Sequence, residues 1–198
     1  MRSVYLVILL LMLIPDTHGA ENGTPWHGSD FIAAELQRTR SDPDSTVSVS
    51  IAAPRAYVFD FLSTRLDEYA DGAAALRFDH AGSASTGRLG RGSLRITTMD
   101  NGETLAQRFL LLTAPTEFAY YTNMELSTLS VPLDYSITRY SLTETNYENT
   151  ELSVTVSYQA SSKLFAFIVR RAFNSALRRD FERAANIIAE KYKNESTE

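Results

Sequence analysis

Residues 46–69, TVSVSIAAPRAYVFDFLSTRLDEY, change their hydrophobic period once, at Pro54. Before this proline, apolar and polar residues alternate, which is typical of a β-strand with one buried face. After it, apolar residues recur at helical spacing. A proline is tolerated in the first turn of a helix because the N–H that it lacks would have no partner there. The stretch therefore predicts a strand that runs directly into a helix.

The sequence downstream predicts a meander of strands. An Asn-Gly turn at 100–102 separates two strand-like runs, 93–99 and 103–113, and this arrangement is a strong hairpin signal. Further strands are expected over 75–81, 117–126, 133–142 and 151–159. In the last of them apolar and polar residues alternate, so one face should be buried and the other exposed to water.

The segment from Ser161 to about Lys193 predicts one long amphipathic helix without glycine or proline. Its apolar positions are Phe173, Leu177, Phe181, Ala184, Ile188 and Tyr192. About 33 residues at 1.5 Å each give a helix on the order of 50 Å long. The opposite face is basic, and we interpret it as a solvated face with partial pairing to acidic neighbours. A surface for anionic membranes is the alternative, which the net charge of −5 disfavours.

The predicted fold class is α+β, in the order strand, helix, five or six strands, long helix. An antiparallel sheet with one wet face must cover its other face. Only the terminal helix is long enough to do so. A strongly curved sheet around a helix leaves a gap, and we expect this gap to be a pocket that the helix after Pro54 helps to close.

The first 20 residues are expected to be a secretory signal peptide. Arg2 precedes an apolar run over 4–14, which is shorter than the bilayer span of about 20 residues but matches the hydrophobic region of a signal. Cleavage after Ala20 would leave His18 where a small residue is usual. The alternative is an uncleaved N-terminal membrane anchor. The prediction is thus a secreted or periplasmic protein, and the absence of cysteine fits export.

The rest of the chain divides into an extension, a domain and a tail. We expect residues 21–44 to form an N-terminal extension with a short helix over 29–40, capped by Ser29. Apolar residues of that helix, Phe31, Ile32 and Leu36, are placed to pack against the main body. Residues 45–193 form the domain, and 194–198 form the tail. With 198 residues, 44% of them hydrophobic, the chain is long enough for one well-packed core.

Residues that carry chemistry are few. His27 and His80 have no metal-ligand spacing, and no nucleophile elbow occurs, so we expect no metal, no cofactor and no catalytic set. His80 beside Asp79 is interpreted as a turn residue rather than an acid/base pair. Loop 82–90 imitates a phosphate-binding loop but lacks its Lys and Ser/Thr. The acidic balance argues against nucleic-acid binding.

Several short signals together resemble the START-like (SRPBCC) superfamily, in particular its polyketide cyclase/dehydrase and lipid-transport group. They are residues 47–63, residues 90–109 followed by Pro115, the Tyr120-Tyr121 pair and the long C-terminal helix. The resemblance covers about residues 45–193. It implies a helix-grip fold, in which a curved antiparallel sheet wraps around the C-terminal helix with an apolar cavity between them. This fold hosts carriers as well as enzymes, so it does not specify a function.

One departure from the resemblance concerns Arg95. Relatives often carry Glu-Arg where this chain has Gln107-Arg108. A three-residue turn at 100–102 places Arg95 opposite Gln107, and a two-residue turn places it opposite Arg108. Neither offers a carboxylate, so an inward-facing Arg95 would need a ligand carboxylate or phosphate. Because arginine is mostly exposed, we expect that it points to solvent or reaches Asp79, Asp134 or Glu125.

The function expected from these observations is binding and transfer of a hydrophobic small molecule, a lipid or fatty acid. Burying roughly 300 Å² of ligand gains on the order of 7 kcal/mol before association costs, so apolar walls are sufficient. The candidate ligand-binding residues are Arg95, Phe109, Tyr120, Tyr135, Phe173 and Leu177. After signal cleavage we expect no membrane span, although transient membrane contact fits a carrier.

Two other functions stay open. A polyketide cyclase or dehydratase would place a buried Asp, Glu or His beside tyrosines in the same cavity. An interaction module would have its cavity filled by its own side chains and would bind an acidic partner through the basic face of the long helix. The sequence does not specify an oligomeric state.

Overall fold

The computed structural model describes residues 28–122, 124, 126–129, 133–161 and 166–197. For residues 166–173 it describes the backbone alone. The predicted signal peptide, Glu125 and the side chain of Phe173 therefore lie outside the described part of the chain.

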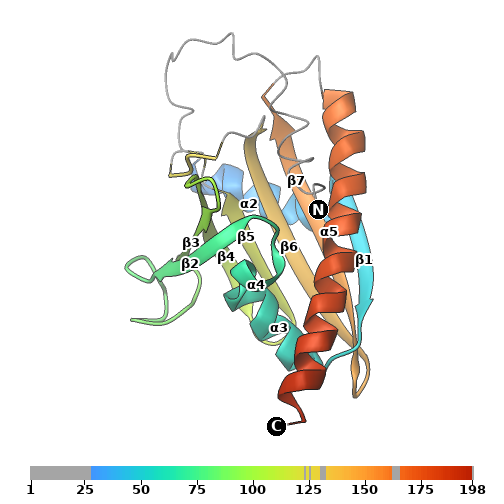
Figure 1. Ribbon diagram of the computed structural model, residues 1–198. Coiled ribbons are helices and arrows are strands. Elements are labelled where there is room, and N and C mark those ends of the chain that lie inside the picture. Colours follow the sequence, from blue (N-terminus) through green and yellow to red (C-terminus); the bar gives the residue numbers. More distant parts are fainter. Residues whose placement is uncertain (1–27, 123, 125, 130–132, 162–165, 198) are drawn as a thin grey trace.

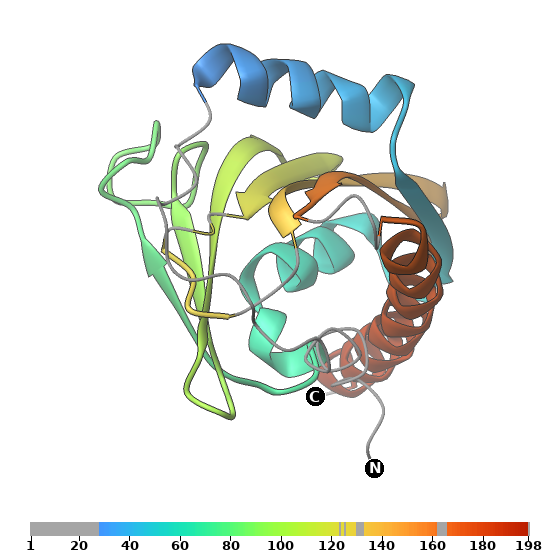
Figure 2. The same ribbon diagram turned by 90° about the horizontal axis from the view of Figure 1, so that it is seen from above.

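Seven strands form one antiparallel sheet in the order β1-β7-β6-β5-β4-β3-β2. The strands are β1 (Ser45–Ile51), β2 (Ala73–Asp79), β3 (Leu94–Met99), β4 (Thr104–Thr113), β5 (Glu117–Thr122), β6 (Leu133–Asn146) and β7 (Asn149–Ala160). The helices are α2 (Ser29–Ser41), α3 (Arg55–Thr64), α4 (Leu66–Tyr69) and α5 (Ala166–Glu195). The sheet curves around α3, α4 and α5 (Figures 1 and 2), which confirms the α+β helix-grip architecture.

The strand-to-helix unit forms as predicted, with one difference at its junction. β1 is followed by α3, and Pro54 is the residue before the helix rather than part of its first turn. The Pro54 carbonyl accepts a hydrogen bond from the Val58 N–H at 3.0 Å. Pro54 therefore still provides the first acceptor in the series of helical hydrogen bonds. The prediction of Ser29 as the cap of α2 is wrong. Gly28 holds that position, and the Ser29 hydroxyl lies 3.4 Å from Asp30 instead of bonding a backbone N–H.

α2 covers the outer face of the sheet, opposite the other helices (Figure 2). Its residues Phe31, Ile32 and Leu36 pack against a cluster of buried outer-face side chains, as predicted. This cluster consists of Tyr121, Tyr135 and Ile137. The expectation of a wet outer face therefore holds only in part, because Ser157 on that face of β7 is fully buried.

The main core fills one end of the concave face. The rings of Phe118 and Tyr140 stack at 4.3 Å between centroids, and Phe59 of α3 and Phe181 of α5 close on them at 5.5 and 5.6 Å. This end is a packed interior. Among the helices that are described, none is long and apolar enough to cross a bilayer.

Candidate functional site

A row of polar side chains crosses the concave face of the sheet. Strand pairing places Arg95 opposite Gln107, Gln107 opposite Thr122, Thr122 opposite Ser136 and Ser136 opposite Tyr158. Residues paired in this way project to the same face of a sheet. We call these five residues the polar row. All of them are buried, so the row is part of the interior rather than of the surface.

Burial differs between the two ends of the concave face. At the packed end Phe118, Tyr140 and Val154 keep 0–2% of their surface exposed. In and beside the polar row six residues keep 5–9%: Gln107, Tyr120, Thr122, Ser136, Thr138 and Tyr158. Phe59 and Phe181, which pack on the apolar end from the helices, keep 7%, so the contrast concerns the sheet residues: those of the polar end are covered less completely than those of the apolar end. This polar end is the candidate site.

Arg95 anchors the row and is fully buried. Its Nε and Nη2 donate to Oε1 of Gln107 at 2.9 and 2.7 Å. Its Nη1 donates to the backbone carbonyls of Leu62 at 3.1 Å and Ser63 at 3.4 Å. The expectation that Arg95 points to solvent or pairs with a carboxylate is thus wrong. Of the two registers that the sequence left open, the structure has the one that pairs Arg95 with Gln107.

The surroundings of the Arg95 guanidinium are neutral. The two carbonyls belong to the last turn of α3, where the helix dipole is equivalent to about half a negative charge. The guanidinium carbon also lies 4.9 Å from the Tyr120 ring centroid and 5.6 Å from that of Phe109, within cation–π range. The helix dipole and the two aromatic rings offset part of the guanidinium charge. The interior around Arg95 therefore keeps a net positive charge.

Three tyrosines adjoin Arg95, and burial keeps two of them, Tyr69 and Tyr140, protonated by raising their pKa. Tyr120 and Tyr140 share a hydrogen bond of 3.0 Å between their hydroxyls, and Tyr69 donates to the Leu62 carbonyl at 3.0 Å. Burial raises the pKa of Tyr69 and of Tyr140. These groups can donate hydrogen bonds at neutral pH, but they are poor bases.

The structure separates the sequence-predicted site residues. Arg95, Phe109 and Tyr120 lie together on the concave face. Leu177 is partly buried and packs against the main core. Tyr135 is wrongly placed by the prediction: it lies on the outer face, where its ring meets Phe31 at 5.1 Å and its hydroxyl donates to Glu35 at 2.8 Å.

Sequence reasoning missed most of the polar row. Gln107 was one of two candidates, since counting from the turn at 100–102 pairs Arg95 with Gln107 or with Arg108. Thr122, Ser136 and Tyr158 carried no usable signal, because their strands are joined by longer connections that do not fix the register.

Acid/base groups are scarce in this site. Among the buried residues of the described chain there is no Asp, Glu or His, and no cluster of metal-ligating residues occurs there either. His80 contacts the Ser93 hydroxyl through Nδ1 at 3.1 Å, while Asp79 accepts from the Ala81 N–H. They do not form a dyad. Half-buried Asp180 of α5 has a pKa raised by desolvation, and its charged neighbours are Arg183, Arg179 and Asp71.

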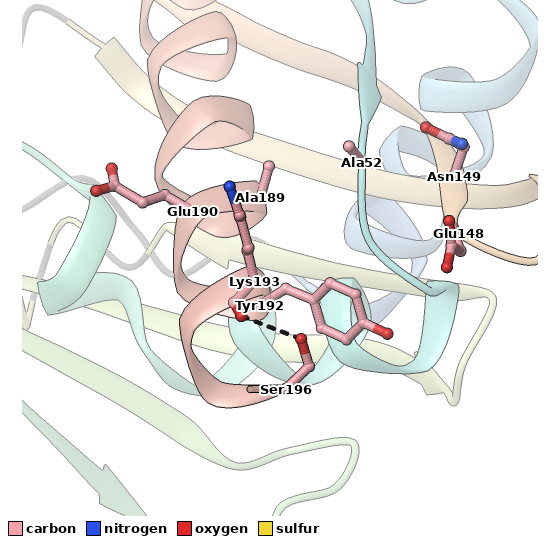
Figure 3. A pocket seen from close by; sticks show the side chains of 8 residues that line it. All are labelled: Ala52, Glu148, Asn149, Ala189, Glu190, Tyr192, Lys193 and Ser196. Carbon is pink, nitrogen blue, oxygen red and sulfur yellow. Dashed lines mark hydrogen bonds between the residues drawn. The ribbon is translucent and has the colours of Figure 1, made fainter. Parts of the chain in front are cut away.

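A separate open pocket of about 500 Å³ lies between the end of α5 and the β6–β7 hairpin (Figure 3). Its lining mixes both charges, with Lys193 and Glu190 from the helix and Glu148 from the hairpin. The Ser196 hydroxyl donates to the Lys193 carbonyl at 3.1 Å at its edge. Beside these charged groups, Ala52, Ala189 and Tyr192 contribute apolar surface to the lining.

No protein-family model matches the chain, and no curated protein matches it in sequence. Several solved structures do share its fold. A norcoclaurine synthase from Thalictrum flavum superposes with a TM-score of 0.54 at 16% identity, over 76% of this chain and 94% of the synthase. An aromatase/cyclase from a Streptomyces species gives 0.52 at 14% identity, over 75% and 92%.

A START superfamily protein from Mycobacterium smegmatis gives a TM-score of 0.54 at 10% identity, over 75% of this chain and 96% of that protein. At such low identities the likeness concerns the fold. It confirms the START-like helix-grip fold that the sequence resemblance implied.

Proposed function

We propose that this protein binds a hydrophobic small molecule, such as a lipid or fatty acid, against the polar end of its concave face. The observation that carries the proposal is the difference in burial between the two ends of that face. At the apolar end the sheet residues Phe118, Tyr140 and Val154 keep 0–2% of their surface exposed, whereas six inward-facing sheet residues in and beside the polar row keep 5–9%. A ligand held there would complete the packing that the protein side chains leave unfinished.

Similar folds support the proposal at a general level. The fold is shared by a START superfamily protein and by an aromatase/cyclase, so small-molecule recognition is a use to which this architecture is put. The predicted signal peptide adds export to the proposal, and the protein would then sequester or carry its ligand outside the cytoplasm.

The enzyme alternative is a cyclase or dehydratase acting in the same site. General acid–base catalysis needs a group whose pKa lies near the working pH. Burial raises the pKa of Tyr69 and of Tyr140 further above that range. No Asp, Glu or His is buried in the described part of the chain. These residues favour binding over catalysis.

A matched pair of threonine substitutions on β6 tests the binding site. Thr138→Phe adds a ring on the concave face beside the polar row, and Thr143→Phe adds the same ring at an exposed position. Native mass spectrometry of protein purified from its own cell envelope would report any bound apolar ligand and the mature N-terminus. A fluorescent fatty acid would report affinity.

We expect the wild type and Thr143→Phe to bind alike and Thr138→Phe to lose at least about tenfold in affinity, or about 1.4 kcal/mol. Circular dichroism checks that both variants are folded. Equal binding by all three proteins would place the ligand elsewhere. Absence of any co-purifying ligand together with absence of fatty-acid binding would contradict the proposed function itself.

A further inference from the structure

We infer that the ligand carries an anionic oxygen group, a carboxylate or a phosphate, and that the side-chain amide of Gln107 donates to it while Arg95 holds that amide in place. The inference rests on the proposed function and specifies its ligand class. Gln107 is then a ligand-binding residue, and Arg95 is a positioning residue behind it.

The orientation of the Gln107 amide follows from hydrogen-bond chemistry. A guanidinium only donates, so the two contacts at 2.9 and 2.7 Å must be made to the amide oxygen. The amide nitrogen, with two N–H groups, is consequently directed away from Arg95. In the described part of the chain no acceptor receives these N–H groups, and the amide nitrogen is not among the buried atoms that are shut off from solvent without a partner. Gln107 keeps 5% of its surface exposed, so a ligand can reach this pair of donors.

The charge of Arg95 selects what those donors bind. Its acceptors are one amide oxygen and two backbone carbonyls, and the α3 dipole supplies about half a compensating charge. In an interior of low dielectric the remaining positive charge attracts an anion more strongly than at the surface. Donation from Gln107 to an oxyanion would be a charge-assisted hydrogen bond, which is stronger than a neutral one.

The neighbouring side chains suit the same ligand. Thr122 faces Gln107 across the strands, and its hydroxyl lies 2.9 Å from that of Ser136. These hydroxyls extend the hydrogen-bonding surface along the polar row. In the adjacent position Tyr120, which keeps 7% of its surface exposed, offers apolar surface for the body of the ligand. A ligand with an oxyanion on a hydrocarbon body would match both the hydrogen-bonding row and the apolar surface beside it.

Gln107→Glu is the decisive substitution. It replaces the N–H donors by oxygen and gives Arg95 a carboxylate, so both the donors and the excess positive charge disappear. Gln37→Glu is the matched control, since it makes the same change on the exposed side of α2. The probes are oleate, monooleyl phosphate and oleyl alcohol, which share one hydrocarbon chain, at a pH near 8 where both acids are ionised.

We expect the wild type and Gln37→Glu to bind at least one of the two anions about tenfold more tightly than oleyl alcohol. Gln107→Glu should lose this preference and keep its affinity for the alcohol within about threefold. Whichever anion binds more tightly identifies the headgroup as carboxylate or phosphate. A preference that survives in Gln107→Glu, or a wild type that binds alcohol and anions equally, overturns the inference and leaves the proposed function standing.

A second measurement needs no variant. The side-chain amide resonance of Gln107 in ¹⁵N-labelled wild type should shift when the preferred anion is added and stay in place with oleyl alcohol. An unchanged resonance with bound anion contradicts the inference. If the wild type binds none of the three probes, the proposed function fails and the inference fails with it.

Discussion

Two arginines are buried in the described part of the chain, one on each face of the sheet, and they are compensated differently. Arg139 of β6 lies under α2 on the outer face, where its Nη1 pairs with the Glu117 carboxylate. Its Nε donates to the Thr39 hydroxyl at 2.7 Å and its Nη2 to the Leu36 carbonyl at 2.9 Å. Arg95 on the concave face has neutral acceptors in place of a carboxylate.

The difference sets a structural arginine, Arg139, apart from the arginine that we propose to support ligand binding. Arg139, Glu117 and Arg40 form an ion-pair group that holds α2 on the sheet, with Arg40 lying 2.8 Å from the same carboxylate. A buried charge that is paired within the protein has no need of a ligand. A buried charge whose partners are an amide and two carbonyls retains the capacity to attract an anion. A buried arginine is thus compensated in two different ways on the two faces of one sheet.

The largest expected effect comes from removing the partner of Arg139. Glu117→Ala leaves a guanidinium with 4% exposure without its carboxylate, and we expect a loss of about 3 kcal/mol in unfolding free energy. Urea denaturation measures it. Glu144→Ala breaks an exposed ion pair with Arg55 and should change stability by less than about 1 kcal/mol. Equal effects of the two changes would show that the Glu117 pair is no stronger than a surface pair.

Removing the cation instead of its partner should cost less. Arg139→Met keeps much of the side-chain volume and leaves Glu117 with Arg40, so no charge is left buried without a partner. The hydrogen bonds to Thr39 and Leu36 are lost, and we expect a decrease of about 2 kcal/mol by the same denaturation experiment. A loss greater than that of Glu117→Ala would contradict the charge argument.

The concave face should respond in the opposite direction. Gln107→Glu supplies Arg95 with the carboxylate that Arg139 already has, so we expect the ligand-free protein to gain about 1 kcal/mol in stability. The midpoint of thermal unfolding should rise. A decrease would mean that the neutral acceptors already balance Arg95, and the contrast between the two arginines would lose its meaning.

The smallest effect is a dependence on pH. Burial opposes ionisation of Glu117, but hydrogen bonds from Arg40 and Arg139 outweigh it and hold its pKa below the usual 4.5. A lowered folded-state pKa contributes stability that is complete above the unfolded value and is lost as pH falls through the folded value. The stability difference between wild type and Glu117→Gln should therefore shrink as pH decreases below about 4.5. A constant difference would contradict this assignment.

The sequence predicted the order and period of the elements well, because these depend on local patterns. The hairpin at 100–102 limited the partner of Arg95 to Gln107 or Arg108, and the structure has Gln107. The direction of Arg95 could not be predicted from exposure preferences. Its acceptors at Leu62 and Ser63 belong to the last turn of α3, and only the fold brings that turn to β3.

Tyr135 shows a second limit. Register shifts occur between Phe109 and Leu111 and between Leu133 and Tyr135, and each changes which residues share a face. Alternation counted along a strand fails across such irregularities. The covering of the outer face could be predicted only in part. The apolar residues of α2 indicated that this helix packs on the main body, but the alternation in β7 predicted that Thr155 and Ser157 are exposed. In the structure Ser157 is fully buried.

α2 also has a consequence for the evolution of the sheet. In β1 buried and exposed positions still alternate, but residues 118–122 of β5 and 135–140 of β6 are buried on both faces. A saturation mutagenesis scan should accordingly show a two-residue rhythm of tolerance along β1 and nearly uniform intolerance in the middle of the sheet. The central strands would thus be the slowest part of this domain to diverge.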